Sequence, residues 1–195
     1  EPLACCVHSV RKAHIRFAET VVIIGMGIMG YFHLKLALMR GARVIVSETD
    51  PSRQAFAREQ GAWKVIDPLK EDLHETISSL TNGLGADVVF NTIPAASVWN
   101  QAIEILAPYG RLMAYSSQDS KQPIGVNFGE FHSREIELIG TLNPTLHDND
   151  IAVKLISYGL IDMRPVIGAK FPFDQAKEAF EKALEPGMYR VVIKY

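Results

Sequence analysis

Short β-branched runs alternate with helical segments along the first 140 residues, and this alternation most strongly limits the possible folds. The first run, Thr20–Ile24 (TVVII), is almost wholly apolar and leads through a glycine-rich turn into a helical segment. Strands of this kind are typical of parallel sheets covered by helices on both faces. Repeated strand–helix–strand units joined by short turns therefore predict an α/β fold with a six-stranded, doubly wound parallel sheet.

The expected elements follow from apolar periodicity and from glycine and proline positions. Strands are expected at residues 20–24, 43–47, 63–66, 87–91, 111–115 and 136–140. Helices are expected at residues 28–40, 51–60, 73–80 and 98–106, with Pro108–Gly110 separating the last helix from its strand. After Gly140 the alternation stops, and helical and extended patterns follow up to a last strand at residues 191–195. We expect this tail to pack on another part of the protein.

The turn after the first strand, Gly25-Met26-Gly27-Ile28-Met29-Gly30, fits G-x-G-x-x-G. The first glycine permits the tight turn, the second lets a pyrophosphate approach the backbone, and the third lets helix and strand pack closely. The amides of Ile28 and Met29 at the helix start would face the anion. The motif stands between an apolar strand and a helix, which is the context a Rossmann dinucleotide site requires.

An acidic residue completes this signal. Glu48 ends the second expected strand, where a carboxylate accepts hydrogen bonds from the adenosine ribose hydroxyls and repels a 2′-phosphate. The pattern therefore predicts NAD in preference to NADP. Arg53 lies close by in sequence and would soften that repulsion.

Composition excludes several other classes of protein. The formal net charge is −2 and the basic residues are scattered, so we expect no nucleic-acid partner. The apolar runs fall short of the roughly 20 residues that span a bilayer, so no membrane segment is expected. Cys5 and Cys6 are the two cysteines of the chain, and neighbouring cysteines rarely bridge, so a reducing, cytoplasmic setting is expected.

The chain resembles the medium-chain dehydrogenase/reductase family, and within it the zinc-type alcohol and sorbitol (polyol) dehydrogenase branch. The resemblance covers essentially all of the chain. It rests on the opening Glu1–Cys6 segment, the glycine turn with Glu48, the strand entry at Ala62 and the closing Arg190–Tyr195 segment. It implies NAD-dependent oxidation of a secondary alcohol or polyol, with a zinc that polarises the alcohol oxygen.

The resemblance also implies roles for single residues. Glu48 and Arg53 match ribose contacts, Thr92 and Ile93 match residues that line the adenine side, and Arg190 matches a basic residue that reaches the pyrophosphate. The stretches Ala114–Ser116 and Thr141–Asn143 match backbone near the nicotinamide carboxamide, which makes Ser116, Thr141 and Asn143 candidate cofactor residues. Pro94 and Tyr115 stand where the family commonly has glycine, and no catalytic residue is assigned.

Zinc is expected only in a full-length enzyme. Glu1 matches a carboxylate that in the polyol branch ligates the metal or sits beside it, and Cys5 matches a cysteine ligand of some relatives. The segments that carry the other ligands in the family are not found in this sequence, and the chain begins without Met. We therefore expect a piece of a longer protein, which binds NAD and by itself catalyses little.

A self-pairing strand is expected at residues 122–128, where Ile124, Val126 and Phe128 alternate with small or polar residues. As an exposed sheet edge it would pair with its copy across a two-fold axis, giving a homodimer. The other possibility is an exposed strand covered by the tail helix.

The predicted organisation has three parts: residues 1–15 end a catalytic domain, residues 16–140 form the NAD-binding Rossmann domain, and residues 141–195 return to the catalytic domain. Two other functions stay open at this point. The first is a non-catalytic NAD(H)-sensing module. The second is an S-adenosylmethionine methyltransferase, against which the complete glycine motif and the tail argue.

Overall fold

The computed structural model describes residues 1–117, 123–185 and 187–195. The chain divides into two compact units, Glu1–Asp150 and Ile151–Tyr195. The first unit holds the parallel sheet, and the second holds a two-stranded sheet. The assignment of residues 1–15 and 141–195 to a catalytic domain stays a prediction.

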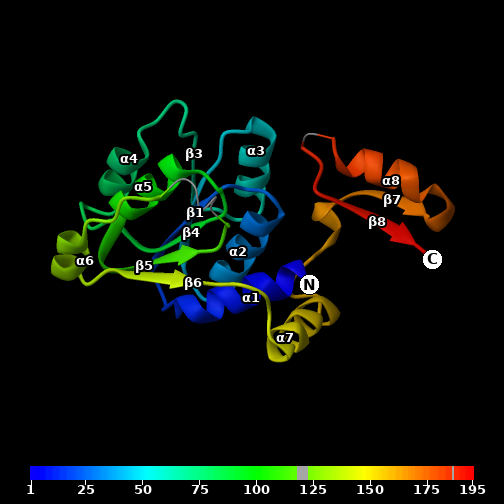
Figure 1. The fold of residues 1–195 in the computed structure, drawn as a ribbon, viewed down its shortest axis with the longest axis horizontal. Coiled ribbons are helices and arrows are strands. Elements are labelled where there is room, and N and C mark those ends of the chain that lie inside the picture. Colours follow the sequence, from blue (N-terminus) through cyan, green and yellow to red (C-terminus); the bar gives the residue numbers. More distant parts are fainter. Residues whose placement is uncertain (118–122, 186) are drawn as a thin grey trace. The chain divides into compact units, whose positions relative to one another are not determined.

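All six expected strands of the first unit are present and parallel, in the order β3-β2-β1-β4-β5-β6 (Figure 1). This is the strand order of a Rossmann fold, so the predicted fold class is confirmed. The winding direction reverses between β1 and β4, and ligands of such folds bind at the carboxyl ends of the strands at that point. The strands are β1 Thr20–Ile24, β2 Arg43–Ser47, β3 Lys64–Ile66, β4 Ala86–Asn91, β5 Leu106–Ala114 and β6 Glu137–Gly140.

Helices connect and cover these strands. Those of the first unit are α1 Pro2–Ala13, α2 Ile28–Met39, α3 Pro51–Glu59, α4 Leu73–Leu80, α5 Ala96–Glu104 and α6 Phe128–Arg134, and α7 Leu146–Ser157 runs across the boundary between the units. In the second unit, β7 Ile167–Pro172 and β8 Arg190–Lys194 pair in parallel and α8 Ala176–Ala183 packs against both. Within the described part of the chain, no helix combines the length and the apolar character needed to cross a bilayer.

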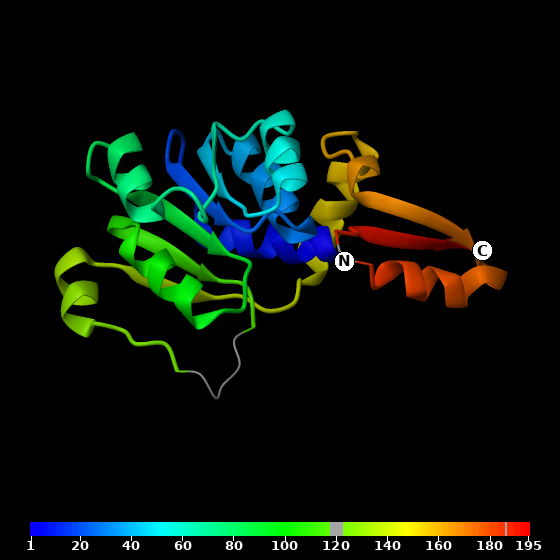
Figure 2. The same cartoon turned by 90° about the horizontal axis from the view of Figure 1, so that it is seen from above.

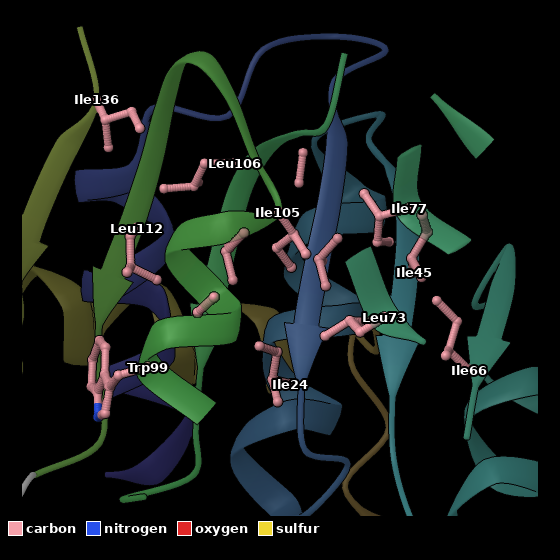
Figure 3. Packing of buried hydrophobic residues seen from close by; sticks show 14 residues of the cluster. Ile24, Ile45, Ile66, Leu73, Ile77, Trp99, Ile105, Leu106, Leu112 and Ile136 are labelled. Atoms are coloured by element: carbon pink, nitrogen blue, oxygen red, sulfur yellow. The ribbon is translucent and has the colours of Figure 1, made fainter. Parts of the chain in front are cut away.

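One face of the sheet packs against α4 and α5. Figure 3 shows Ile24, Ile45 and Ile66 from neighbouring strands together with Leu73 of α4 and Trp99 of α5. All five side chains are buried. This cluster holds the carboxyl ends of β1, β2 and β3 in register, and the dinucleotide motif begins at the end of β1.

The opposite face is covered by α2. His33 of α2 contacts the ring of Phe90, which alternates along β4 with Val89 of the first cluster. Helix α1 packs on α2, and the two lie side by side in both views (Figures 1 and 2). Because α2 is enclosed by the sheet and by α1, most of its residues are buried rather than a single stripe.

Strand β5 begins earlier than the sequence predicts. Leu106 pairs with Ala86 of β4, and the register then shifts so that Val88 pairs with Arg111. The extra residues form a bulge, in which Tyr109 has a φ of 62°. Pro108 is tolerated there because a bulge does not need its missing N–H for the ladder. The proline therefore interrupts the register of the strand and not the strand itself.

The predicted edge strand at residues 122–128 is wrong for the residues that the structure describes. Pro123–Asn127 form no strand and α6 begins at Phe128, while Gln122 lies outside the described residues. The Asn127 side chain caps this helix by accepting from the amides of Gly129 at 3.0 Å and Glu130 at 3.4 Å. Ile124 packs against the core cluster, so alternating burial arises here without a strand partner.

Candidate functional site: a dinucleotide cavity

A cavity of about 460 Å³ lies at the carboxyl ends of β1, β2 and β4. Eight of the predicted cofactor residues line it: Gly25, Gly27, Ile28, Met29, Glu48, Arg53, Thr92 and Ile93. The sequence patterns did not single out the other lining residues, which are Ile24, Ser47, Thr49, Pro68, Val98 and Gln101. Pro68 had a usable signal, since it closely follows β3 and parallel strands present their carboxyl ends to one edge.

The three glycines of the turn differ in their surroundings. Gly25 has a φ of +95°, and a Cβ there would strike the Thr92 and Ile93 side chains. A Cβ on Gly30 would strike the Gly25 carbonyl, since the helix passes directly over the turn. A Cβ on Gly27 would meet nothing within 4 Å, and Gly27 lines the cavity. Its missing side chain therefore leaves open the space that a close backbone–ligand approach needs.

Helix α2 begins at this turn with unsatisfied donors. Gly27 is its N-cap and supplies no side-chain hydrogen bond. The first amides of a helix have no intrahelical acceptor, and the helix dipole places partial positive charge beside them. Ile28 and Met29 occupy these positions and line the cavity. The geometry thus provides an anion-binding helix start where the motif predicts the pyrophosphate.

Glu48 is buried at the end of β2, and its carboxylate ties two loops together. Oε2 accepts from the amide of Met26 at 2.6 Å, and Oε1 accepts from the amides of Thr49 at 2.8 Å and Asp50 at 2.9 Å. A carboxylate has about four acceptor positions, so these bonds leave about one, on Oε2. The same residue therefore shapes the glycine turn and keeps an acceptor for a ligand hydroxyl.

Thr92 and Ile93 close the side of the cavity next to β4. The Thr92 hydroxyl donates to the Ile24 carbonyl at 2.7 Å, and the Ile93 amide donates to the Asn91 side chain at 2.9 Å. The Nδ2 atom of Asn91 is buried and has no partner within the described residues. Pro94 is exposed beyond this turn and does not line the cavity.

The predicted nicotinamide-side residues gather at the ends of β5 and β6. A separate cavity of about 140 Å³ is lined by Cys5, His8, Tyr115, Thr141, Leu142 and Asn143. The hydroxyls of Ser116 and Thr141 are buried without a hydrogen-bond partner among the described residues. Buried hydroxyls are normally bonded, so these two are candidates to bind a ligand amide or carbonyl.

Tyr115 turns its hydroxyl toward the protein interior. It lies 3.2 Å from Sδ of Met29 and 3.5 Å from Sγ of Cys6, and its ring meets that of His33 edge to face at 4.6 Å. Burial raises the pKa of Tyr115 and that of Cys6, so both stay protonated near neutral pH. Tyr115 therefore buttresses the helix start through Met29, a role that sequence reasoning did not assign.

The residues present do not fit a zinc ion. No group of three or more His, Cys, Asp or Glu side chains in residues 1–117, 123–185 and 187–195 could hold a metal. Glu1 is exposed and accepts from Sγ of Cys5 at 2.8 Å. Desolvation and this bond raise the pKa of Cys5 to about 11, which disfavours the thiolate that metals bind.

Arg190 and Gly30 line neither of these two cavities. Arg190 begins β8 in the second unit and is exposed, so its contact with a pyrophosphate stays a prediction. Of the three glycines in the motif, Gly30 packs inside the fold and does not line the dinucleotide cavity. Its part in the site is to let α2 sit against the turn.

Known dehydrogenases resemble this chain in sequence. The family profile described as zinc-binding dehydrogenase matches residues 25–157. The D-arabitol-phosphate dehydrogenase of Enterococcus avium is 32% identical over 197 residues, which cover 100% of this chain and 56% of that enzyme. The L-threonine 3-dehydrogenase of Caldanaerobacter subterraneus is 30% identical over 196 residues, covering 99% of this chain and 56% of that enzyme.

A solved structure agrees over the whole length. A protein from Sinorhizobium meliloti, described as a zinc-binding dehydrogenase bound to NADP, superposes with a TM-score of 0.89 at 28% identity. The match covers 100% of this chain and 58% of that one. The chain thus spans little more than half the length of the relatives it matches.

Proposed function

Because the chain belongs to the zinc-binding dehydrogenase family, we propose that it is the NAD-binding portion of a zinc-dependent oxidoreductase that oxidises a secondary alcohol or a polyol. The names of the relatives support this class of reaction: one acts on an alditol phosphate and another on a hydroxy amino acid. These substrates differ too much to select one for this chain. The comparisons give no support to the alternative of a non-catalytic NAD(H)-sensing module.

The observation that carries the proposal is the open face of Gly27 beside the first amides of α2. We propose that the pyrophosphate binds the amides of Ile28 and Met29 and that an adenosine ribose hydroxyl donates to Oε2 of Glu48. The adenine would then lie along Thr92 and Ile93. When bound, NAD supplies the hydride acceptor, and the residues of this chain position it and exclude water around it.

The preference for NAD rests on Glu48. Its carboxylate is held by three backbone amides, so it cannot turn away from a 2′-phosphate without breaking them. Arg53 lines the same cavity and supplies the opposing attraction. A relative bound to NADP shows that the fold also admits that cofactor. We propose that the carboxylate outweighs the guanidinium in this chain.

At the other end of the cofactor, we propose that Ser116, Thr141 and Asn143 meet the nicotinamide carboxamide and that Arg190 reaches the pyrophosphate. Zinc belongs to the full-length enzyme, with Glu1 at or beside the metal. No step of the reaction is assigned to the metal through the residues described here, because they do not form a ligand set.

Titration of the purified chain with NADH and with NADPH tests the proposal. Calorimetry should show that NADH binds at least tenfold more tightly than NADPH. Glu48→Gln should reduce this ratio of the two dissociation constants, because it removes the charge and keeps the side-chain size. His74→Gln, an exposed change outside the cavity, is the control. Equal affinities would remove the assignment of Glu48, and binding of neither cofactor would remove the proposed function.

A homodimer in the cytoplasm completes the proposal. The edge strands of the described sheet are β3 and β6; Leu138 of β6 is half exposed, and a strand edge of this kind can pair with its copy across a two-fold axis. Cys5 and Cys6 are free, which supports a reducing compartment. Sedimentation of the chain and of Leu138→Lys tests the dimer, and a monomer at tens of micromolar would exclude it.

A further inference from the structure

A third cavity, of about 620 Å³, lies in the first unit; it shares no lining residue with the dinucleotide cavity and one, His8, with the small cavity at the ends of β5 and β6. It is bounded by the last turns of α1, the end of α2 and the start of α7. Its lining consists of His8, Val10, Arg11, Lys12, His14, Ile15, Arg40, Thr145 and His147. Nothing in the proposed function uses this cavity.

The lining is basic although the chain is not. Three of the nine lining residues are Arg or Lys, three more are His and none is acidic, whereas the whole chain has a formal net charge of −2 with His counted as neutral. Like charges that surround one cavity repel each other, and an anion inside it would relieve that repulsion. The cavity is therefore a place of positive potential on a slightly acidic protein.

A buried carboxylate orients two of these side chains. Asp148 is fully buried and accepts from Nδ1 of His8 at 2.9 Å and from Nη1 of Arg11 at 2.5 Å. Burial alone would raise the pKa of Asp148, but hydrogen bonds from Thr145, Arg11 and His8 lower it well below the usual range. The Asp148 carboxylate stays charged, and it fixes the positions of His8 and Arg11 without lining the cavity itself.

Other cations of the lining keep donors for a ligand. Lys12 donates to the Gly140 carbonyl at 2.6 Å, which uses one of the three donors of an ammonium. The side chains of His14, Arg40 and His147 make no hydrogen bond or ion pair with any residue in the described ranges. Three cationic or donor groups thus face the cavity uncommitted.

Compensation of helix dipoles explains only part of this arrangement. Arg11, Lys12 and Arg40 stand at the carboxyl ends of α1 and α2, where a cation is favoured in any protein. Thr145 and His147 stand at the amino end of α7, where the dipole favours an anion and disfavours a cation. The Asp148 carboxylate in the first turn of α7 already meets that dipole, so the donors left for an anion are those of Lys12, His14, Arg40 and His147.

We propose that this cavity binds a small anion that carries phosphate or carboxylate groups. Its volume falls within the roughly 300–1,000 Å³ of typical small-molecule sites. The anion contacts Arg11, Lys12 and Arg40 and accepts from His14 and His147. The site is independent of the dinucleotide cavity, so the proposed function and this inference stand or fall separately.

The test is calorimetric titration of the purified chain at pH 7 with inorganic phosphate and, in a second arm, with citrate, each with and without saturating NADH. Phosphate, citrate or both should bind, and Lys12→Gln/Arg40→Gln should weaken that binding at least tenfold. The matched control Lys35→Gln/Arg58→Gln removes two cations outside the cavity and should leave binding unchanged. Binding of phosphate would indicate a ligand with phosphate groups, and binding of citrate one with carboxylate groups.

A loss of folding would not account for the expected loss of anion binding. Arg40 and His147 have no side-chain partner in the described part of the chain, so Arg40→Gln and His147→Gln tested singly should keep the unfolding midpoint and still weaken binding. Three outcomes would overturn the inference: no binding of either anion, equal weakening by the control pair, or binding that NADH abolishes and the cavity variants do not change. The last result would assign the anion to the glycine turn.

Discussion

The carbonyl oxygen of Gly25 occupies the space that a side chain on Gly30 would need. The turn and the helix that follows it are in direct backbone contact there, so neither can move without the other. Both glycines serve the packing of the fold, although Gly25 also lines the cavity, whereas Gly27 has open space where a side chain would be. This difference separates a stability function from a binding function within one six-residue motif, and it leads to two opposite predictions.

Gly30→Ala should destabilise the fold. The new Cβ meets rigid backbone, so α2 must shift from β1, and overpacking of this kind costs about 1–3 kcal/mol. Urea unfolding followed by circular dichroism measures the loss. A variant as stable as the parent would show that the turn yields more easily than its packing indicates.

Gly27→Ala should spare stability and weaken the cofactor. The φ of Gly27 is −67°, which alanine adopts freely, and the lower entropy of the unfolded chain, worth about 0.4–1 kcal/mol, offsets the weaker preference of alanine for the N-cap position. The methyl group would enter the space proposed for the pyrophosphate, and we expect at least tenfold weaker NADH binding by calorimetry. Unchanged affinity would mean that the cofactor does not approach Gly27.

Arg111→Met should be strongly destabilising. The buried guanidinium contacts Oε1 of Glu19 at 2.5 Å and donates to the carbonyls of Ala13 at 2.7 Å and His14 at 3.0 Å. Removing it leaves Glu19, whose side chain is 12% exposed, without its counter-ion, which costs about 3–5 kcal/mol. Urea unfolding should also show partial recovery in Arg111→Met/Glu19→Gln. Equal losses in the single and double variants would mean that the carbonyl contacts, and not the charge of Glu19, set the cost.

His33 should make the fold sensitive to mild acid. Burial lowers the pKa of His33 from 6.5 to about 4, although its bond to the Met29 carbonyl acts in the opposite direction. Between these two values the unfolded chain binds a proton that the folded chain refuses, so stability falls as pH falls from about 6.5 to about 4, by at most about 3 kcal/mol.

Unfolding by urea at pH 7 and at pH 4.5 measures this effect. His33→Phe should reduce the difference between the two pH values by about 2 kcal/mol, and His74→Gln, at an exposed position, should not change it. If the parent and His33→Phe lost equal stability in acid, the acid sensitivity would belong to other groups.

The sequence alone determined the elements whose signals are local. Three such signals predict structure within a few residues of themselves: the β-branched run Thr20–Ile24, the glycines after it and the acid at Glu48. The structure has the strand, the turn and the lining residue that they predict. Apolar strands and tight turns need no distant partner to be recognised, because side-chain burial and backbone freedom are set within a few residues.

Tertiary structure decided what depends on distant partners. Ile124 and Val126 have the pattern of a strand, but no neighbouring strand pairs with residues 123–127, and Asn127 starts a helix instead. In the basic cavity, His8 is oriented by Asp148, which lies 140 positions later in the chain. A sequence pattern states which side chains can be buried together, while hydrogen-bond partners and cavities are selected only when the folded chain brings those side chains into contact.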